Sequence, residues 1–166
     1  MNTGLTQFFQ QNLWANLRLL DECANLTDEQ LDATLDGTYG SVRVTLMHIF
    51  AGEESYVQHF TGQRPEPALR TSNPFVGFDE LRKRARLNGE SLIALAGQWE
   101  EGDVLHIPDD GEIYDIPAII VLIQAINHAT DHRSQIATIL GQQGIEFPEL
   151  SGWRYFDAIS ESGATG

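Results

Sequence analysis

The sequence has a single cysteine, only ten basic residues and no long run of apolar residues. A lone Cys23 excludes an intrachain disulfide and fits a reducing cytoplasm. The apolar run Ile116–Ile123 spans eight residues and contains Pro117, so it is too short to cross a bilayer and we expect no membrane partner. The N-terminus lacks the basic and apolar segments of a signal peptide. These absences together favour a cytoplasmic protein.

Positive charge is scarce as well. Ten basic residues stand against 24 acidic ones, which gives a formal net charge of −14. Binding a phosphate backbone requires clustered Lys and Arg, so we expect no nucleic-acid partner. Arg82, Lys83, Arg84 and Arg86 form a local cluster, but on a helix they point in several directions. We expect them to lie on a solvated face.

What the sequence does contain is helical periodicity. Its 166 residues, 42% of them hydrophobic, suit one domain over residues 1–166 with a single core. Apolar residues recur at three- and four-residue steps in four long segments, which predicts helices at 5–25, 41–60, 78–99 and 117–141. Thr27 and Gln30 are spaced as a capping box. The fold class is therefore all-α, a four-helix bundle.

Two smaller elements accompany the bundle. The stretch DVLHI, PDDG, EIYDI at 103–116 predicts a small β-hairpin before the last long helix, with an irregular crossover as the alternative. A short C-terminal helix is expected to begin near Ser151, with Trp153 and Phe156 covering the bundle.

The last long helix carries two histidines one turn apart. His128 and His132 lie in a seam with Val121, Ala125 and Ile136, so their rings stack along one buried face. Two imidazoles at this spacing can converge on one metal ion. The alternative is a pair of core histidines satisfied by hydrogen bonds, and the spacing leaves both open.

Three stretches resemble a known family: QNLWANLRLL, GSVRVTLMHIFAGEESYV and INHATDHRSQIATILGQQGIEFPEL. They are similar to the DinB-like (DinB/YfiT) superfamily, whose members are regarded as metal-dependent enzymes. The most specific match is a histidine on the second long helix, His48, followed about eighty residues later by His-x-x-x-His-Arg-x-Gln, beginning at His128. The resemblance implies a four-helix bundle, often a homodimer, in which His48, His128 and His132 bind one divalent metal ion. Ser134 stands where many members have glycine.

The resemblance also extends to the first helix. Trp14 and Asn16 match the family's Trp-Ala-Asn, which implies that they wall the same cavity, although core packing is an equal alternative for Trp14. Arg133 points away from the histidine seam by about 100°. We therefore expect Arg133 to pair with a surface carboxylate.

Three neutral imidazoles leave a divalent ion its charge and an open position. Zinc, nickel, iron and manganese all accept such ligands, so the metal is left undetermined. Relatives known to transfer thiols imply an enzyme that transfers a low-molecular-weight thiol to an electrophilic small-molecule substrate. A metal-dependent hydrolase and a non-catalytic metal-binding or ligand-binding protein of the stress response are the alternatives. The family name also suggests a role in DNA damage, but the net charge counts against it.

Overall fold

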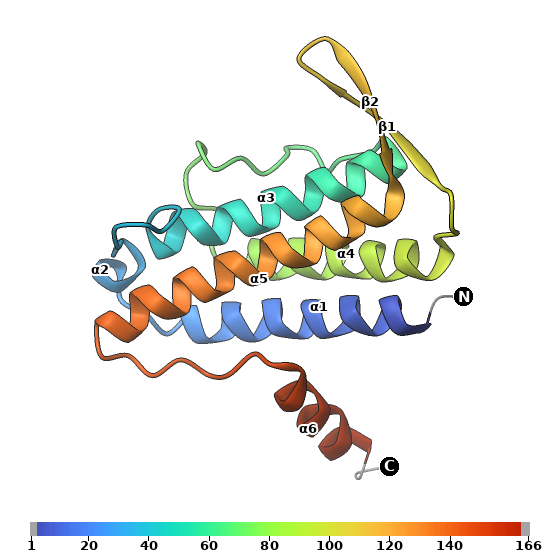
Figure 1. The fold of residues 1–166 in the computed structure, drawn as a ribbon. Helices are drawn as coiled ribbons and strands as arrows, with labels where there is room; N and C mark the ends of the chain where they lie inside the picture. The colour runs from blue at the N-terminus through green and yellow to red at the C-terminus, as the bar shows by residue number, and fades with distance from the viewer. Residues whose placement is uncertain (1–2, 164–166) are drawn as a thin grey trace.

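A computed structural model describes residues 3–163 of the chain and shows a helical bundle with a small antiparallel hairpin (Figure 1). Four long helices form the bundle, and their bounds lie within a few residues of the predicted ones. The elements in chain order are α1 (Thr3–Cys23), α2 (Asp28–Leu31), α3 (Val42–Thr61), α4 (Phe78–Gln98), β1 (Val104–Asp109), β2 (Glu112–Pro117), α5 (Ala118–Gln142) and α6 (Gly152–Gly163). The predicted fold class is confirmed.

Local sequence explains where the helices begin and end. Gln30 N donates to Thr27 Oγ1 at 3.3 Å and Thr27 N donates to Gln30 Oε1 at 2.8 Å, which confirms the predicted capping box before α2. Ser41 caps α3 by accepting a hydrogen bond from Val44 N. Gly62 ends α3 in the left-handed conformation, with φ of 70°, which only glycine adopts without strain.

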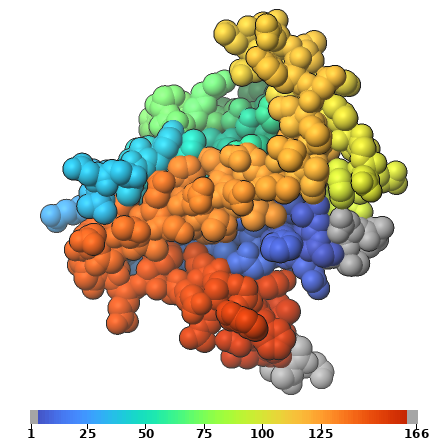
Figure 2. Space-filling model, in the orientation of Figure 1, coloured from blue at the N-terminus to red at the C-terminus, as the bar shows by residue number. Residues whose placement is uncertain are grey.

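The hairpin predicted for residues 103–116 is present, so this prediction is correct and the alternative of an irregular crossover is excluded. β1 and β2 pair antiparallel, with Asp109 opposite Glu112 across a two-residue turn. Asp110 and Gly111 have φ of 47° and 82°, and Asp-Gly is the sequence that such turns favour because both central residues need positive φ. In the space-filling view the hairpin projects beyond the helices (Figure 2).

Arg84 corrects the expectation of a solvated basic face on α4. Its side chain is buried, and Nη1 lies 2.7 Å from Glu54 Oε1 while Nε lies 2.6 Å from Glu80 Oε1. Arg84 shares the core-facing side of α4 with Leu81, Ala85 and Asn88. The charge is buried there because Glu54 of α3, itself fully buried, supplies a partner. A count of basic residues alone does not reveal such a partner.

The short C-terminal helix is present, but the two aromatic residues predicted to cover the bundle do not do so. Trp153 is 80% exposed and Phe156 59% exposed. Tyr155 lies against Trp14 of α1 instead, with ring centroids 5.8 Å apart. Since residues two apart on a helix differ by about 200°, Tyr155 facing α1 turns Trp153 outward. The C-terminal segment stands out from α1 and α5 as a separate lobe (Figure 2).

In the part of the chain that the structure describes, no helix is both long enough and apolar enough to span a membrane.

Candidate metal centre

The structure brings together the three histidines that the sequence singled out. His48 comes from α3, and His128 and His132 come from α5. One ring nitrogen from each lies within 4.8 Å of the other two, and each pair of ring centroids is 4.6 Å apart. Two helices packed side by side therefore present three nitrogen donors to one small volume.

The protonation of His132 follows from its hydrogen bonds. Gln135 Oε1 accepts from the Tyr39 backbone N–H at 2.9 Å and lies 3.1 Å from His132 Nδ1. Because the Tyr39 N–H can only donate, the Gln135 atom that it meets is the oxygen, and His132 Nδ1 must then carry a proton. A neutral ring protonated at Nδ1 has its lone pair on Nε2. Gln135 thus leaves the Nε2 of His132 free to bind a metal ion.

The other two rings are also suited to be neutral ligands. His128 Nε2 lies 2.9 Å from His48 Nε2. Burial, with smaller contributions from His132 and His48, lowers the pKa of His128 to about 4, and burial also lowers the pKa of His48. Metal ligation requires unprotonated nitrogen. The donor set therefore fits a divalent ion that accepts imidazole, such as zinc, nickel, iron or manganese.

Close packing holds the rings in place. A Cβ at Gly52 would lie 2.6 Å from Cε1 of His128, so only glycine lets the two helices approach here. The Tyr39 ring stacks on His48, with centroids 3.8 Å apart and planes 14° from parallel. His128 Nδ1 is buried, and no hydrogen-bond partner for it occurs among the described residues.

A buried polar cluster lies between α1, α3 and α5, and it includes Asn16. Glu53 Oε1 accepts hydrogen bonds from Asn12 at 2.9 Å and from Asn16 at 2.7 Å. Arg133 donates to the side-chain oxygens of the same two asparagines at 2.7 Å each, and to Thr130. Burial raises the pKa of Glu53 to about 7, against the lowering effect of its hydrogen bonds and of Arg133.

The cluster corrects the expectation for Arg133. Its side chain is buried rather than paired with a surface carboxylate, and desolvation lowers its pKa to about 10. Position 133 faces α1, so a side chain that points away from the histidine seam here packs against another helix and does not reach solvent.

Trp14 is half-buried against Tyr155. Neither Trp14 nor Asn16 is among the described residues that line the cleft beside His48, and a role for them in a substrate cavity stays a prediction.

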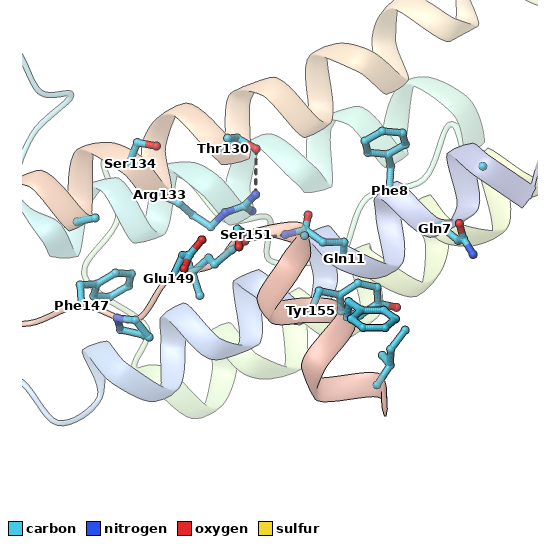
Figure 3. A pocket seen from close by; sticks show the side chains of 17 residues that line it. Gln7, Phe8, Gln11, Thr130, Arg133, Ser134, Phe147, Glu149, Ser151 and Tyr155 are labelled. Carbon is cyan, nitrogen blue, oxygen red and sulfur yellow. Dashed lines mark hydrogen bonds between the residues drawn. The ribbon is translucent and has the colours of Figure 1, made fainter. Parts of the chain in front are cut away.

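A second cavity, larger than the cleft beside His48, is separate from the histidines. It is a groove of about 1010 Å³ between α1, α5 and residues 147–159, with Arg133 and Thr130 on one wall and Phe8, Phe147 and Tyr155 among its apolar residues (Figure 3). None of the three histidines lines it. We place the candidate chemistry at the histidines because their nitrogen donors converge there, whereas volume alone identifies no reaction.

Two residues of the site, Tyr39 and Gly52, are not predicted from the sequence. Tyr39 lies in the loop before α3, where no periodicity points to a role, and only the folded chain brings it onto His48. Gly52 does leave a trace in the sequence, because it stands four residues after His48 in a stripe of small and polar residues on the same helix. A glycine inside a helix commonly marks a close approach.

The fold and the site define a class: a four-helix bundle with a three-histidine cluster between two of its long helices. The DinB family model matches residues 1–162, and the chain therefore belongs to the DinB family. It is 22% identical over 147 residues to the protein DinB of Bacillus subtilis (strain 168), covering 83% of this chain and 85% of that one. Its fold is similar to that of a DinB-like protein from Bacillus cereus, with a TM-score of 0.66, 20% identity, and coverage of 90% of this chain and 99% of that one.

Proposed function

We propose that this protein is a metal-dependent enzyme that transfers a small thiol to an electrophilic small molecule. The observation that supports it is the convergence of His48, His128 and His132, whose donor nitrogens lie within 4.8 Å of one another. A divalent ion held by three neutral imidazoles would keep its charge and an open position, and would lower the pKa of a thiol or water bound there. The identity of the ion is left open among zinc, nickel, iron and manganese.

The chain's own residues define the rest of the proposal. Cys23 is fully buried, and burial raises the pKa of its thiol to about 12. A buried, protonated thiol is a poor nucleophile. The thiol must then come from solution, so the proposal includes a reducing, cytoplasmic location.

The neutral histidines would act as ligands and not as acids. A ring with its pKa at about 4, such as His128, is not an imidazolium at neutral pH and therefore cannot act as a general acid there. Gln135 would hold His132 in the tautomer that ligation requires, and the Tyr39 ring would cover one face of His48. These residues orient donors and restrict access, while the reacting groups come from the substrates.

We also propose that the protein is a homodimer. Trp153 (80%), Phe156 (59%) and Ile159 (49%) of α6 are exposed, the last two along the groove between α6 and α1, and a second copy covering α6 would remove this apolar surface from water. Sedimentation of wild type and of Trp153→Ser with Phe156→Ser tests it. A dimer that becomes a monomer in the double variant supports the proposal, and a monomeric wild type rules it out.

The reaction is tested with metal-loaded protein and an electrophile such as an epoxide or a chlorinated arene, with and without a panel of cellular thiols. Turnover that requires a thiol supports transfer. Turnover in water alone would show a hydrolase instead. If neither exceeds the rate of the His48→Ala variant, the protein is a metal-binding or ligand-binding protein without catalytic activity.

A further inference from the structure

A cleft of about 360 Å³ lies beside the histidine cluster, between α3 and the segment that follows it. His48 and Ser55 line it from α3, and Arg70, Thr71 and Ser72 line it from the segment at residues 62–77. None of the described residues that line it is acidic. That is unusual surface for a chain whose formal net charge is −14.

Arg70 carries a positive charge that no carboxylate of the described residues neutralises. Of the ten basic side chains, eight make a hydrogen bond or ion pair within residues 3–163. Arg70 and Arg86 are the two that remain, and Arg86 lies on α4, outside the cleft. Arg64 also lines the cleft, but Glu54 is its ion-pair partner at 3.3 Å. Arg70 is therefore the uncompensated charge of the cleft.

The backbone of Leu69, the residue before Arg70, is held by hydrogen bonds to both its N–H and its carbonyl group. Leu69 N donates to Glu54 Oε2 at 2.9 Å, and Leu69 O accepts from Arg64 Nη2 at 3.0 Å. The Leu69 side chain is buried, and Arg84 Nη2 donates to Pro67 O at 3.1 Å. Glu54, Arg64 and Arg84 thus hold the backbone that precedes Arg70 in position before any ligand binds. Preorganisation of this kind lowers the entropic cost of binding.

We propose that the cleft beside His48 binds a small anionic group, a carboxylate or a phosphate, with Arg70 as its cation. The inference rests on the proposed function, because the anionic group belongs to a molecule whose reacting end reaches the histidine site. Guanidinium presents paired N–H donors that match carboxylate and phosphate oxygens. The hydroxyls of Ser55, Thr71 and Ser72 supply further donors in the same cleft. The thiol and the electrophile are the two possible carriers of the anion.

The anion site is tested first without metal. Inorganic phosphate is titrated into chelator-treated protein at alkaline pH, where the histidines are neutral, while NMR follows the backbone amides of Thr71 and Ser72. We expect saturable shifts in wild type and in the matched control Arg86→Gln, and at least about tenfold weaker binding in Arg70→Gln. Arg70→Lys should restore part of the affinity. Equal binding by Arg70→Gln, or no saturable shift in wild type, overturns the proposal.

A second measurement identifies the carrier with cobalt(II)-loaded protein and two thiols of similar size, mercaptoacetate and 2-mercaptoethanol. Thiolate-to-metal absorption reports binding. Tighter binding of mercaptoacetate in wild type, lost in Arg70→Gln, assigns the anion to the thiol, and equal binding assigns it to the electrophile. If neither thiol produces the absorption, the thiol-transfer function fails while the phosphate titration still decides the anion site.

Discussion

Gln135 Oε1 lies 3.1 Å from His132 Nδ1 and accepts a hydrogen bond from the backbone N–H of Tyr39. The contact fixes which nitrogen of His132 is free, and it joins the loop before α3 to the middle of α5. Outer-shell partners of this kind commonly affect metal affinity almost as much as the ligands themselves. Gln135, three positions along the same helix, and Tyr39, a loop residue 96 positions away from Gln135, thus determine together which nitrogen of His132 can bind a metal ion.

Replacing Gln135 with alanine should weaken metal binding by about 10–100-fold, because His132 would lose the acceptor that holds Nδ1–H. The fold should be retained. A competition titration against a chromogenic chelator measures the affinity. Gln142→Ala, an exposed position at the end of the same helix, is the control. Equal affinities for the two variants would contradict the role assigned to Gln135.

Replacing Gly52 with alanine should displace the His128 ring, because the new Cβ would lie 2.6 Å from Cε1. We expect metal affinity to fall by at least about tenfold. Gly141→Ala is the matched control, since a Cβ there meets nothing within 4 Å and should raise stability by about 0.5–1 kcal/mol. The chelator titration and urea unfolding are run on both. Unchanged affinity in Gly52→Ala would show that the rings tolerate the displacement.

Glu54 should matter for stability more than any exposed carboxylate. It is fully buried and bonds Arg84 at 2.7 Å and Leu69 N at 2.9 Å, so Glu54→Ala leaves a buried guanidinium without this partner. We expect a loss of about 3–5 kcal/mol in the free energy of unfolding. The exposed Glu90→Ala on the same bundle should change it by about 0.5 kcal/mol or less. A loss under about 1 kcal/mol in Glu54→Ala would contradict the importance of this network.

Sequence periodicity determined most of the architecture and part of the site. The four long helices follow from three- and four-residue spacing, and the Asp-Gly turn follows from its φ requirement. His128 and His132 share a face because they are four residues apart. The facing histidine on α3 came from the family resemblance, since spacing says nothing about which helices become neighbours.

The errors share one cause. The expectations for Arg84, Arg133 and Phe156 each consider one helix by itself, whereas a bundle helix has two or three neighbours. Arg84 and Arg133 are buried because Glu54 and the pair Asn12 and Asn16 meet them from other helices. Phe156 is exposed because α6 contacts α1 through Tyr155. Such partners are set by tertiary packing and leave no pattern in the sequence.

The raised pKa of Glu53 should affect how the stability of the protein depends on pH. Its pKa is raised from 4.5 to about 7, so between these values the folded chain holds a proton that the unfolded chain releases. The contribution of Glu53 therefore destabilises the folded state as pH rises through this window. His128, with its pKa lowered from 6.5 to about 4, has the opposite effect, because the unfolded chain then binds more protons. The two offset each other between about pH 4.5 and 6.5.

The variant Glu53→Gln removes the contribution of Glu53 to the pH dependence and leaves that of His128. The free energy of unfolding of the variant minus that of wild type should increase from about pH 5 to about pH 8, by about 3 kcal/mol at most. Urea unfolding of chelator-treated protein measures it, with the exposed Glu90→Gln as the control. A difference that stays constant across the range would show that Glu53 titrates normally.

The most direct test of the three-histidine site is elemental analysis of protein purified without chelator and reconstituted with each candidate metal in turn. We predict one divalent ion per chain in wild type and in His59→Ala, whose histidine lies outside the cluster, and loss of the ion in His132→Ala with helical content unchanged. Equal metal content in His132→Ala and wild type would contradict the site.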